Sequence, residues 1–347
     1  LAESLQSAGY TTWAFQTNAN LTAALGFAQG FAPEDYHFSG GASASQVTEA
    51  ALNALPEFGA PFFAYAHYME PHAPYWPGPQ YADALGEHPS LSDYDHALLS
   101  DDVRFMAYYM DQAKTALGLQ DGPTVPDLSA AGKAAVEHRY ALECFAMDQA
   151  IEKLVGGIQQ RHPNTLFVFL SDHGEEFWER DGMGHGTTLH QEQVHVPFIL
   201  VGPHIPQVSI DDTVSTLDLF PTLLALLELP AVACDGVDLG AGPGPRPVYS
   251  FSQGPWPALK VNTRAVFFDG YSYLLDCRRD SSSLFHIPGD ALERNDLRTE
   301  KLEVAARLAD LLSAHLRAFE GSLSQDGVPL DDAARETLEA LGYVDGL

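Results

Sequence analysis

The chain has 347 residues, 46% of them hydrophobic, which suits one large domain or two smaller ones and excludes a mostly disordered protein. It carries 18 lysines and arginines against 47 aspartates and glutamates, a formal net charge of -29, so no nucleic-acid partner is expected. Any site for an anionic substrate must therefore carry its own local positive charge. The three cysteines lack metal-cluster spacing, and no run of 18 apolar residues predicts a transmembrane segment.

Strand-like and helix-like segments alternate over the first two thirds of the chain. The strand candidates are short runs rich in Val, Phe, Tyr or Ile, at residues 11–17, 61–68, 165–171 and 196–202. The helix candidates are at residues 1–8, 45–55, 101–117, 131–160 and 215–227. Residues 165–171 are apolar without alternation, which favours a strand buried on both faces of a parallel sheet. This order predicts a doubly wound α/β domain, a mostly parallel sheet flanked by helices.

The pattern changes near residue 236, so we predict an α/β domain at 1–235 and a smaller α+β subdomain at 236–347. Strand-like runs at residues 247–251, 263–268, 271–275 and 283–287 predict a small antiparallel sheet. Asp269-Gly270 is a strong two-residue hairpin signal between two of them. A helix at 300–319 and an amphipathic tail at 331–341 follow. Residues 75–100, rich in Pro, Gly, Asp and His, are interpreted as a long surface loop.

Asp172 and His173 follow directly after the strand candidate at 165–171, in the sequence Ser-Asp-His-Gly-Glu-Glu. In open α/β sheets, ligands bind at the carboxyl ends of strands. An Asp and a His together suit Ca²⁺, Mn²⁺, Mg²⁺ or Zn²⁺ rather than a soft metal, with further ligands coming from elsewhere. The alternative is that Asp172 caps a following helix and His173 is an ordinary surface residue.

His185 lies between two glycines twelve residues after His173, where a ring can approach a ligand closely. It could donate to an oxyanion or act as a general acid, or it could be an ordinary loop histidine. His67 within the strand candidate at 61–68 is interpreted as a satisfied core histidine.

His72 and Tyr75 lie in Glu-Pro-His-Ala-Pro-Tyr, after another buried-looking strand. The two prolines fix the loop on both sides of His72, as a scaffold that presents a catalytic imidazole would, although a Pro-braced turn with an incidental histidine is the alternative. Tyr75 either stacks on a substrate or packs inside. On the helix candidate at 131–160, we expect structural support from Tyr140, Glu143 and Asp148 rather than chemistry.

Six collinear segments together resemble the sulfatase family of the alkaline phosphatase superfamily. They are LQSAGYTTWAFQTNANL, PFFAYAHYMEPHAPY, RYALECFAMDQAIEKL, NTLFVFLSDHGEEFWERDGMGHGTTLHQEQVHVPFIL, STLDLFPTLL and LEALGYV. The resemblance implies an alkaline phosphatase-like α/β enzyme with a smaller C-terminal antiparallel subdomain. Such enzymes cleave sulfate esters of small molecules or glycans, and some relatives cleave phosphate esters. One divalent metal is typical, most often Ca²⁺, with Mn²⁺, Mg²⁺ or Zn²⁺ as alternatives.

The resemblance also assigns roles to residues. Asp172 and His173 match half of the metal site, although many sulfatases have Asn at the second position and the Asp-His form is commoner in phosphoesterase-like relatives. His185 lies where many members have a Lys that contacts the sulfate, and His72 matches a histidine on the leaving-group side. We therefore expect His72 and His185 to be catalytic, and His72, Tyr75 and His185 to bind substrate. His72 and His185 are expected to meet Asp172 and His173 at one edge of the sheet.

The resemblance does not extend to the segment that carries the family's nucleophile. Family members carry it in a C/S-x-P-x-R segment, after a first pair of acidic metal ligands, and none of Cys144, Cys234 or Cys277 has that context. We expect this chain alone to bind metal weakly and to turn over nothing, with the first strand, half the metal site and the nucleophile in a preceding segment. The alternatives are a phosphodiesterase or phosphotransferase of the same superfamily, or a non-catalytic binding protein if the chain is naturally this short. By family analogy, a periplasmic or extracellular location is expected.

Overall fold

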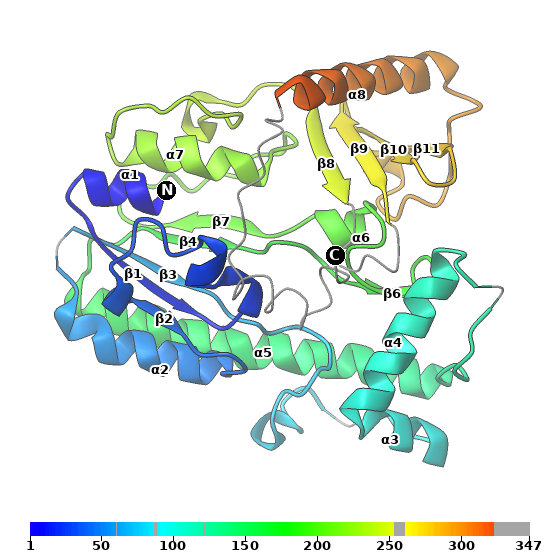
Figure 1. The fold of residues 1–347 in the computed structure, drawn as a ribbon, viewed down its shortest axis with the longest axis horizontal. Helices are drawn as coiled ribbons and strands as arrows, with labels where there is room; N and C mark the ends of the chain where they lie inside the picture. The colour runs from blue at the N-terminus through cyan, green and yellow to red at the C-terminus, as the bar shows by residue number, and fades with distance from the viewer. Residues whose placement is uncertain (60, 87–88, 121, 253–260, 323–347) are drawn as a thin grey trace.

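In the computed structural model, a layer of strands lies between two layers of helices (Figure 1). The structure describes residues 1–59, 61–86, 89–120, 122–252 and 261–322. Helices α2 and α5 cover one face of the strand layer, and α1 and α7 lie on the other. The helices are α1 (Ala2–Ser7), α2 (Ala44–Ala54), α3 (Asp93–Leu99), α4 (Asp102–Ala116), α5 (Ala130–Arg161), α6 (Gln191–Val194), α7 (Leu219–Leu226) and α8 (Leu302–Ser322). The doubly wound α/β expectation is confirmed.

The strands follow the expected segments closely and add three short ones, β2, β5 and β6. They are β1 (Thr11–Gln16), β2 (Tyr36–Phe38), β3 (Phe62–Ala66), β4 (Phe167–Leu170), β5 (Glu176–Phe177), β6 (Met183–Gly184), β7 (Phe198–Val201), β8 (Val248–Ser252), β9 (Thr263–Phe268), β10 (Tyr271–Asp276) and β11 (Ser281–His286). The first three form a parallel sheet in the order β2-β1-β3, with Thr11 opposite Phe62 and Ala14 opposite Tyr36.

The pairing of β4 differs from the expectation. It pairs with β7 in the antiparallel direction, Phe167 opposite Val201 and Leu170 opposite Phe198. The reason is the connection between them, which holds the β5–β6 hairpin and the four-residue α6 but no long crossover helix. A chain that returns without a helical crossover comes back antiparallel.

The strand β4 is also less buried than its sequence indicates. Leu170 is 40% exposed, and Tyr65 on β3 is 39% exposed. Among the described residues, β3 pairs with β1 and β4 pairs with β7, but β3 and β4 do not pair with each other. The expectation that residues 165–171 are buried on both faces is therefore wrong for the described structure.

The region expected to be a long surface loop contains a helix. Within residues 75–100, α3 is capped by the Ser92 side chain, which accepts from the Asp95 N–H. Asp95 is buried and accepts hydrogen bonds from Ser129 at the start of α5, while Leu98 and Leu99 enter the core. The N-cap serine satisfies a backbone N–H at the start of the helix, and the two leucines bury apolar surface. Together these contributions order the segment.

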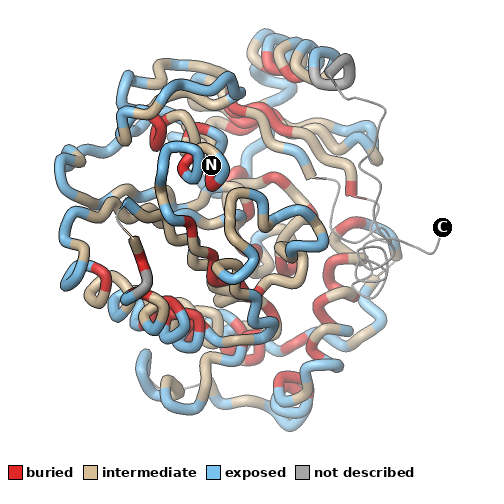
Figure 2. Tube along the Cα trace, turned by 60° about the vertical axis from the view of Figure 1, so that its left-hand side comes forward, coloured by how far each residue is buried: buried red, intermediate tan, exposed pale blue. Residues whose placement is uncertain are grey.

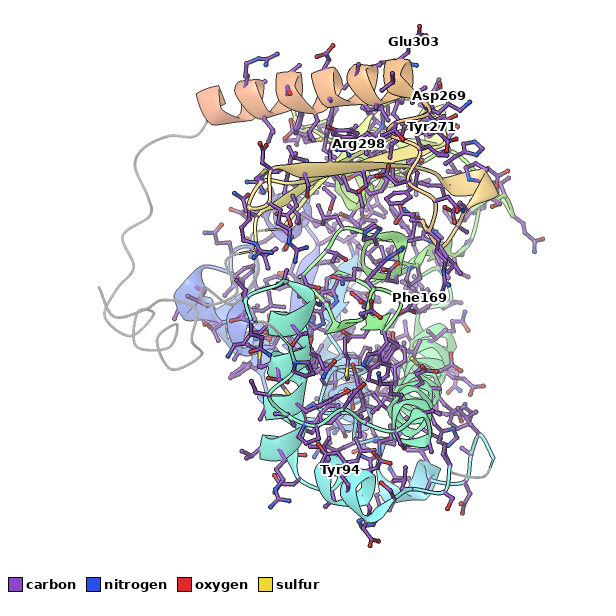
Figure 3. All side chains as sticks on the ribbon, turned by 90° about the vertical axis from the view of Figure 1, so that its right-hand side faces the viewer. Tyr94, Phe169, Asp269, Tyr271, Arg298 and Glu303 are labelled. Atoms are coloured by element: carbon purple, nitrogen blue, oxygen red, sulfur yellow. The ribbon has the colours of Figure 1, made fainter. Side chains whose placement is uncertain are left out.

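The C-terminal sheet has the order β11-β10-β9-β8 and is antiparallel throughout. The expected turn is present, since Asp269 and Gly270 join β9 to β10 with φ of 56° and 76°. Helix α8 lies over this sheet (Figure 3). Its residues Leu308 and Leu312 belong to one core cluster with the strands. Figure 2 shows buried stretches along these strands, whereas the outer loops are exposed. The tail expected at 331–341 lies outside the described residues.

The C-terminal sheet contacts the segment that follows β4. Leu189 packs against Val248 and Phe267 in one core cluster. Glu293, almost fully buried, accepts from His190 Nδ1 at 2.7 Å, and Arg180 donates to the Glu293 carbonyl at 2.9 Å. These contacts join the two parts, while the boundary after residue 235 stays a prediction.

Asp111 on α4 holds the following loop through several hydrogen bonds, and its replacement by Asn should destabilise the fold. It accepts from the backbone N–H groups of Thr124 and Val125 and from Gln120. Burial would raise the pKa of Asp111, but the hydrogen bonds from Thr124, Gln120 and Val125 outweigh it and lower the pKa to about 2. Asp111→Asn should lower the free energy of unfolding by about 1–3 kcal/mol, measured by urea denaturation at pH 7.

The pH dependence provides the check on this prediction. A carboxyl whose folded pKa lies below its unfolded value stabilises the fold above the unfolded pKa, and this contribution is lost as pH falls through the folded pKa. The difference between the native protein and Asp111→Asn should therefore shrink from about pH 4 towards pH 2. A difference that stays constant over this range would show that the charge of Asp111 is not what holds the loop.

Candidate active site

Three histidines from separate segments meet beyond the carboxyl ends of β3 and β4. The ring centroids of His173 and His185 are 3.8 Å apart and stacked, and those of His72 and His185 are 5.3 Å apart. Asp172 adjoins His173, with its Oδ2 atom 3.7 Å from His173 Nε2. The structure thus brings together four of the five side chains that the sequence singled out, and the fifth, Tyr75, is buried among aromatic side chains.

Asp172 and His173 are presented by the turn that ends β4. The Asp172 Oδ1 atom accepts from the His173 N–H at 3.0 Å, which leaves Oδ2 for a ligand. Since a carbonyl can only accept, His173 Nδ1 carries the proton and donates to Gly174 O at 2.8 Å. Gly174 is required for close approach, because a Cβ there would overlap the Glu192 backbone carbonyl. Asp172 Oδ2 and His173 Nε2 therefore face outward side by side.

His185 is fixed on both its ring and its backbone. Its Nδ1 atom lies 3.1 Å from Glu175 Oε1, and its N–H donates to the Tyr109 hydroxyl of α4 at 3.2 Å. The Glu175 carboxylate, which is almost fully buried, fixes the proton on Nδ1 and leaves Nε2 for the site. Gly184 precedes it at φ 100°, where a Cβ would overlap the Tyr109 hydroxyl, so only glycine fits.

His72 lies in a loop flanked by two prolines, and both the Glu70-Pro71 and Ala73-Pro74 peptide bonds are cis. Its Nδ1 atom donates to Ala73 O at 2.6 Å. Burial, together with the nearby His185 and opposed by the bond to Ala73 O, lowers the pKa of His72 below its usual range. The His72 ring is therefore neutral near pH 7, with the lone pair on Nε2.

The three rings share one arrangement: each places Nδ1 against an oxygen acceptor and keeps Nε2 for other partners. Histidines that bind metals or transfer protons in proteins are typically held in this way, because the second bond sets the tautomer and the ring direction. The cluster is therefore built for chemistry at Nε2 rather than for packing alone.

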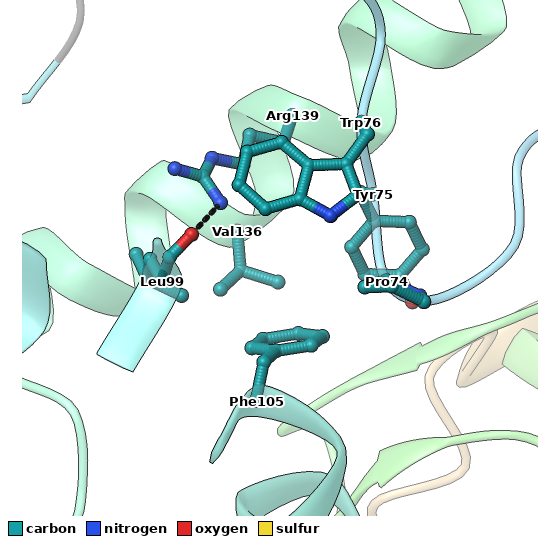
Figure 4. Close-up of a pocket in the computed structure, with 7 residues that line it drawn as sticks. All are labelled: Pro74, Tyr75, Trp76, Leu99, Phe105, Val136 and Arg139. Carbon is teal, nitrogen blue, oxygen red and sulfur yellow. Dashed lines mark hydrogen bonds between the residues drawn. The ribbon is translucent and has the colours of Figure 1, made fainter. Parts of the chain in front are cut away.

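Tyr75 packs in the core among other aromatic side chains. The side chain is 2% exposed, with its ring edge-on to Tyr140 and Phe105 and near Phe177. Burial and the charge of Glu175 raise the pKa of Tyr75. The burial favours the alternative that Tyr75 packs inside, because aromatic neighbours on three elements surround its ring, and a substrate-binding role for Tyr75 stays a prediction. Figure 4 shows the adjoining hollow, where Trp76 lies beside Arg139 and Phe105 lies below.

The end of β3 also faces Asp172. Burial lowers the pKa of His67, opposed by the charge of Asp172, and burial and Asp172 raise the pKa of Tyr65 to about 12. The interpretation of His67 as a satisfied core histidine is wrong, because its Nδ1 atom is buried and has no hydrogen-bond partner among the residues that the structure describes. His67 directly follows β3, and this position at the end of a strand was a signal that the sequence offered.

Three glutamates support the site: Glu143 was expected to give structural support, whereas Glu175 and Glu176 were assigned no role from the sequence. Glu175 orients His185, as described above. Glu176 is buried and accepts from the N–H groups of Arg180 and Gly182, which shapes the loop that carries His185. Glu143 accepts from the loop that carries His72. Each acts through a tertiary contact, which residue spacing alone does not encode.

The donor set present here fits part of a metal site. Asp172 Oδ2 and His173 Nε2 are 3.7 Å apart, close enough for both to reach one ion at the usual bond lengths of about 2.0–2.6 Å. Within the described ranges, no group of three or more His, Cys, Asp or Glu side chains is arranged to hold a metal.

None of the helices in those ranges combines the length and apolarity that a membrane crossing requires.

Comparison with known proteins identifies the family. The sulfatase family model matches residues 1–229. The curated relatives include an uncharacterized sulfatase, YidJ, of Escherichia coli K12, 25% identical over 49% of this chain and 32% of its own length. Arylsulfatase K of Gallus gallus is 28% identical over 27% of this chain and 18% of its own length.

Solved structures share the fold. The protein BT4656, solved in complex with its substrate D-glucosamine-2-N,6-O-disulfate, has a TM-score of 0.68 at 16% identity, over 92% of this chain and 82% of that one. A phosphonate monoester hydrolase from Silicibacter pomeroyi has a TM-score of 0.63 at 18% identity, over 93% and 80%. Both likenesses concern the fold, whereas the matches to the curated relatives span about a third of their length or less. The family model covers most of the chain, and the chain therefore belongs to the sulfatase family.

Proposed function

We propose that these residues form one half of a sulfatase active site that hydrolyses sulfate esters of small molecules or glycans. The observation that carries the proposal is the convergence of His72, His173 and His185, each with Nε2 left for the site. The nucleophile and the remaining metal ligands would come from a segment outside residues 1–347. By analogy with exported sulfatases, we place the protein in the periplasm or outside the cell.

Asp172 and His173 would hold a divalent metal, with Ca²⁺ as the first choice and Mn²⁺, Mg²⁺ or Zn²⁺ as alternatives. Sulfatases as a family generally use such an ion. When bound, it would polarise the ester oxygens as a Lewis acid. Asp172 contributes a carboxylate oxygen that every one of these ions accepts, while the imidazole of His173 shifts the preference towards Mn²⁺ or Zn²⁺.

His185 and His72 would divide the remaining work. The Glu175 carboxylate holds the His185 ring through Nδ1, so Nε2 would face the anionic ester and, where it carries a proton, donate to an ester oxygen. His72 is neutral near pH 7, so its Nε2 can accept a proton from the nucleophile and later return it to the leaving oxygen. Two imidazoles in different environments thus take the donor and the acceptor roles.

The nucleophile has no candidate in this site. In the described ranges, no serine, threonine or cysteine side chain is hydrogen-bonded to His72 or His185, and the Ser171 hydroxyl donates to the His173 carbonyl. A nucleophile needs an adjacent base or another means of activation. A formylglycine, serine or threonine from elsewhere in the protein would fill this place.

Phosphate-ester hydrolysis is the second candidate. The histidine at position 173 is the form commoner in phosphoesterase-like relatives, and the fold is shared with the phosphonate monoester hydrolase. The site residues bind tetrahedral anions of either kind, so the substrate must be decided by assay.

The test compares aryl sulfate and aryl phosphate hydrolysis by the protein expressed from its complete reading frame and by the 347-residue chain. We expect the complete protein to prefer the sulfate ester and to need a divalent cation, and the 347-residue chain to turn over neither. A preference for the phosphate ester would favour the second candidate. Robust turnover by the 347-residue chain would contradict the half-site.

A further inference from the structure

Glu143 is a buried carboxylate in the middle of α5 that binds the loop carrying His72. The residue is 3% exposed. Its Oε2 atom accepts from the His72 N–H at 3.2 Å, and its Oε1 atom accepts from the Trp76 N–H at 2.5 Å. The two bonds enclose the segment from 72 to 76, so one side chain spans the whole presenting turn.

A buried carboxylate needs a reason, because removing a charge from water is costly unless hydrogen bonds compensate. Here the compensation comes from the His72 loop rather than from a cation, since no salt bridge is seen for Glu143 among the described residues. Two other contacts anchor the same loop: the Tyr75 ring packs against Tyr140, and Glu70 Oε1 accepts from the Ala44 N–H at 2.6 Å. Of these, only Glu143 bonds to the backbone of His72 itself.

We propose that Glu143 is a positioning residue for His72, fixing the turn so that the His72 ring faces His185. The inference rests on the proposed function for its catalytic meaning, but the contact itself does not depend on which ester is cleaved. With one carboxylate oxygen on each end of the turn, rotation of the 72–76 segment breaks at least one bond. The His72 ring is further tied to its own loop by the bond from Nδ1 to Ala73 O.

The charge state of Glu143 makes the contact observable. Burial raises the pKa of Glu143 to about 7, an effect that Glu70 adds to and that the N–H bonds from Trp76 and His72 oppose. The titratable groups that face it are Glu70 from the loop, and Tyr140 and Cys144 from α5 itself. Burial raises the pKa of both Tyr140 and Cys144, so these two are neutral near pH 7. Glu143 therefore gains its negative charge as pH rises through about 7, and both N–H bonds strengthen.

The experiment follows the backbone amide protons of His72 and Trp76 by ¹⁵N–¹H NMR of the 347-residue chain from pH 5 to pH 9. We expect both signals to move downfield together with a midpoint near 7. In E143Q this shared titration should be lost, because the isosteric amide cannot ionise. The matched control is E137Q, an exposed glutamate on the same helix, which should keep it.

A second readout separates positioning from simple stabilisation. The ¹⁵N signals of the His72 ring should show one tautomer, with the proton on Nδ1, in the native chain and in E137Q. In E143Q the separation between the Nδ1 and Nε2 signals should collapse towards the average of two tautomers. If E143Q lowers the melting temperature but leaves the amide titration and the His72 ring signals as in the native chain, the proposal is overturned. These readouts need no turnover, so failure of the sulfatase assay would leave their outcome intact.

Discussion

Replacing His185 with alanine is expected to lower kcat for sulfate-ester hydrolysis about 10²–10³-fold in the complete protein, the usual cost of removing one charge-stabilising donor. The ring is held by Glu175 and by its backbone bond to Tyr109, and its Nε2 enters the site from a different loop than Asp172 and His173. Metal content should therefore stay close to that of the native protein. Steady-state kinetics and elemental analysis of the same preparation provide the measurement.

The milder variant Glu175→Gln serves as the companion to this experiment. It keeps a hydrogen-bond acceptor near His185 Nδ1 but removes the carboxylate charge, so we expect a smaller loss of kcat than in His185→Ala. If His185→Ala loses its metal and regains activity when metal is added, then His185 is a metal ligand and the role proposed for it is wrong.

Asp172→Ala is expected to abolish metal retention, with a fall in affinity of at least about 100-fold, since even residues behind the ligands cost 10–100-fold. Asp172 offers the only carboxylate beside His173 Nε2 within the described residues, and its second oxygen is already used by the His173 N–H. Isothermal titration of the metal-free complete protein with Ca²⁺, Mn²⁺ and Zn²⁺ measures the loss.

The control for this variant is Asp212→Ala, an exposed aspartate outside the histidine cluster. It lowers the acidic charge by the same amount and should leave metal affinity unchanged. Equal losses in Asp172→Ala and Asp212→Ala would mean that the net charge of -29, rather than a specific ligand, attracts the cation.

The sequence predicted the elements well where local pattern and packing agree. The strands that became β1, β3, β4 and β7 were each expected within a few residues, as was the Asp269-Gly270 turn. The direction of β7 was not, because it depends on whether the chain between two strands crosses over, and that is decided by a hairpin and a four-residue helix. The helix α3 was missed because Pro, Gly and His around it outweighed the Ser92 cap and the Leu98-Leu99 pair.

In the site, too, local sequence predicted some features, while others depend on tertiary contacts. The positions of His72 and His173 just after strand candidates, and of His185 between two glycines, were sufficient to predict that the three rings meet. They could not reveal that Tyr75 turns inward, since that depends on Tyr140 and Phe105 from two other helices. The supporting roles of Glu143 and Glu175 are likewise tertiary, because each partner lies on another segment or after an intervening turn.

The central claim is that the Nε2 atoms of His72 and His185 face the bound anion. The most direct test is ¹⁵N NMR of the histidine-labelled complete protein with Ca²⁺. On titration with inorganic sulfate, the Nε2 signals of His72 and His185 should shift and saturate together while their Nδ1 signals stay nearly fixed by Ala73 O and Glu175. His190, held by Glu293 at the contact with the C-terminal sheet, should not respond. Saturation behaviour confined to other histidines, or no response of His72 and His185 at any sulfate concentration, would contradict the account.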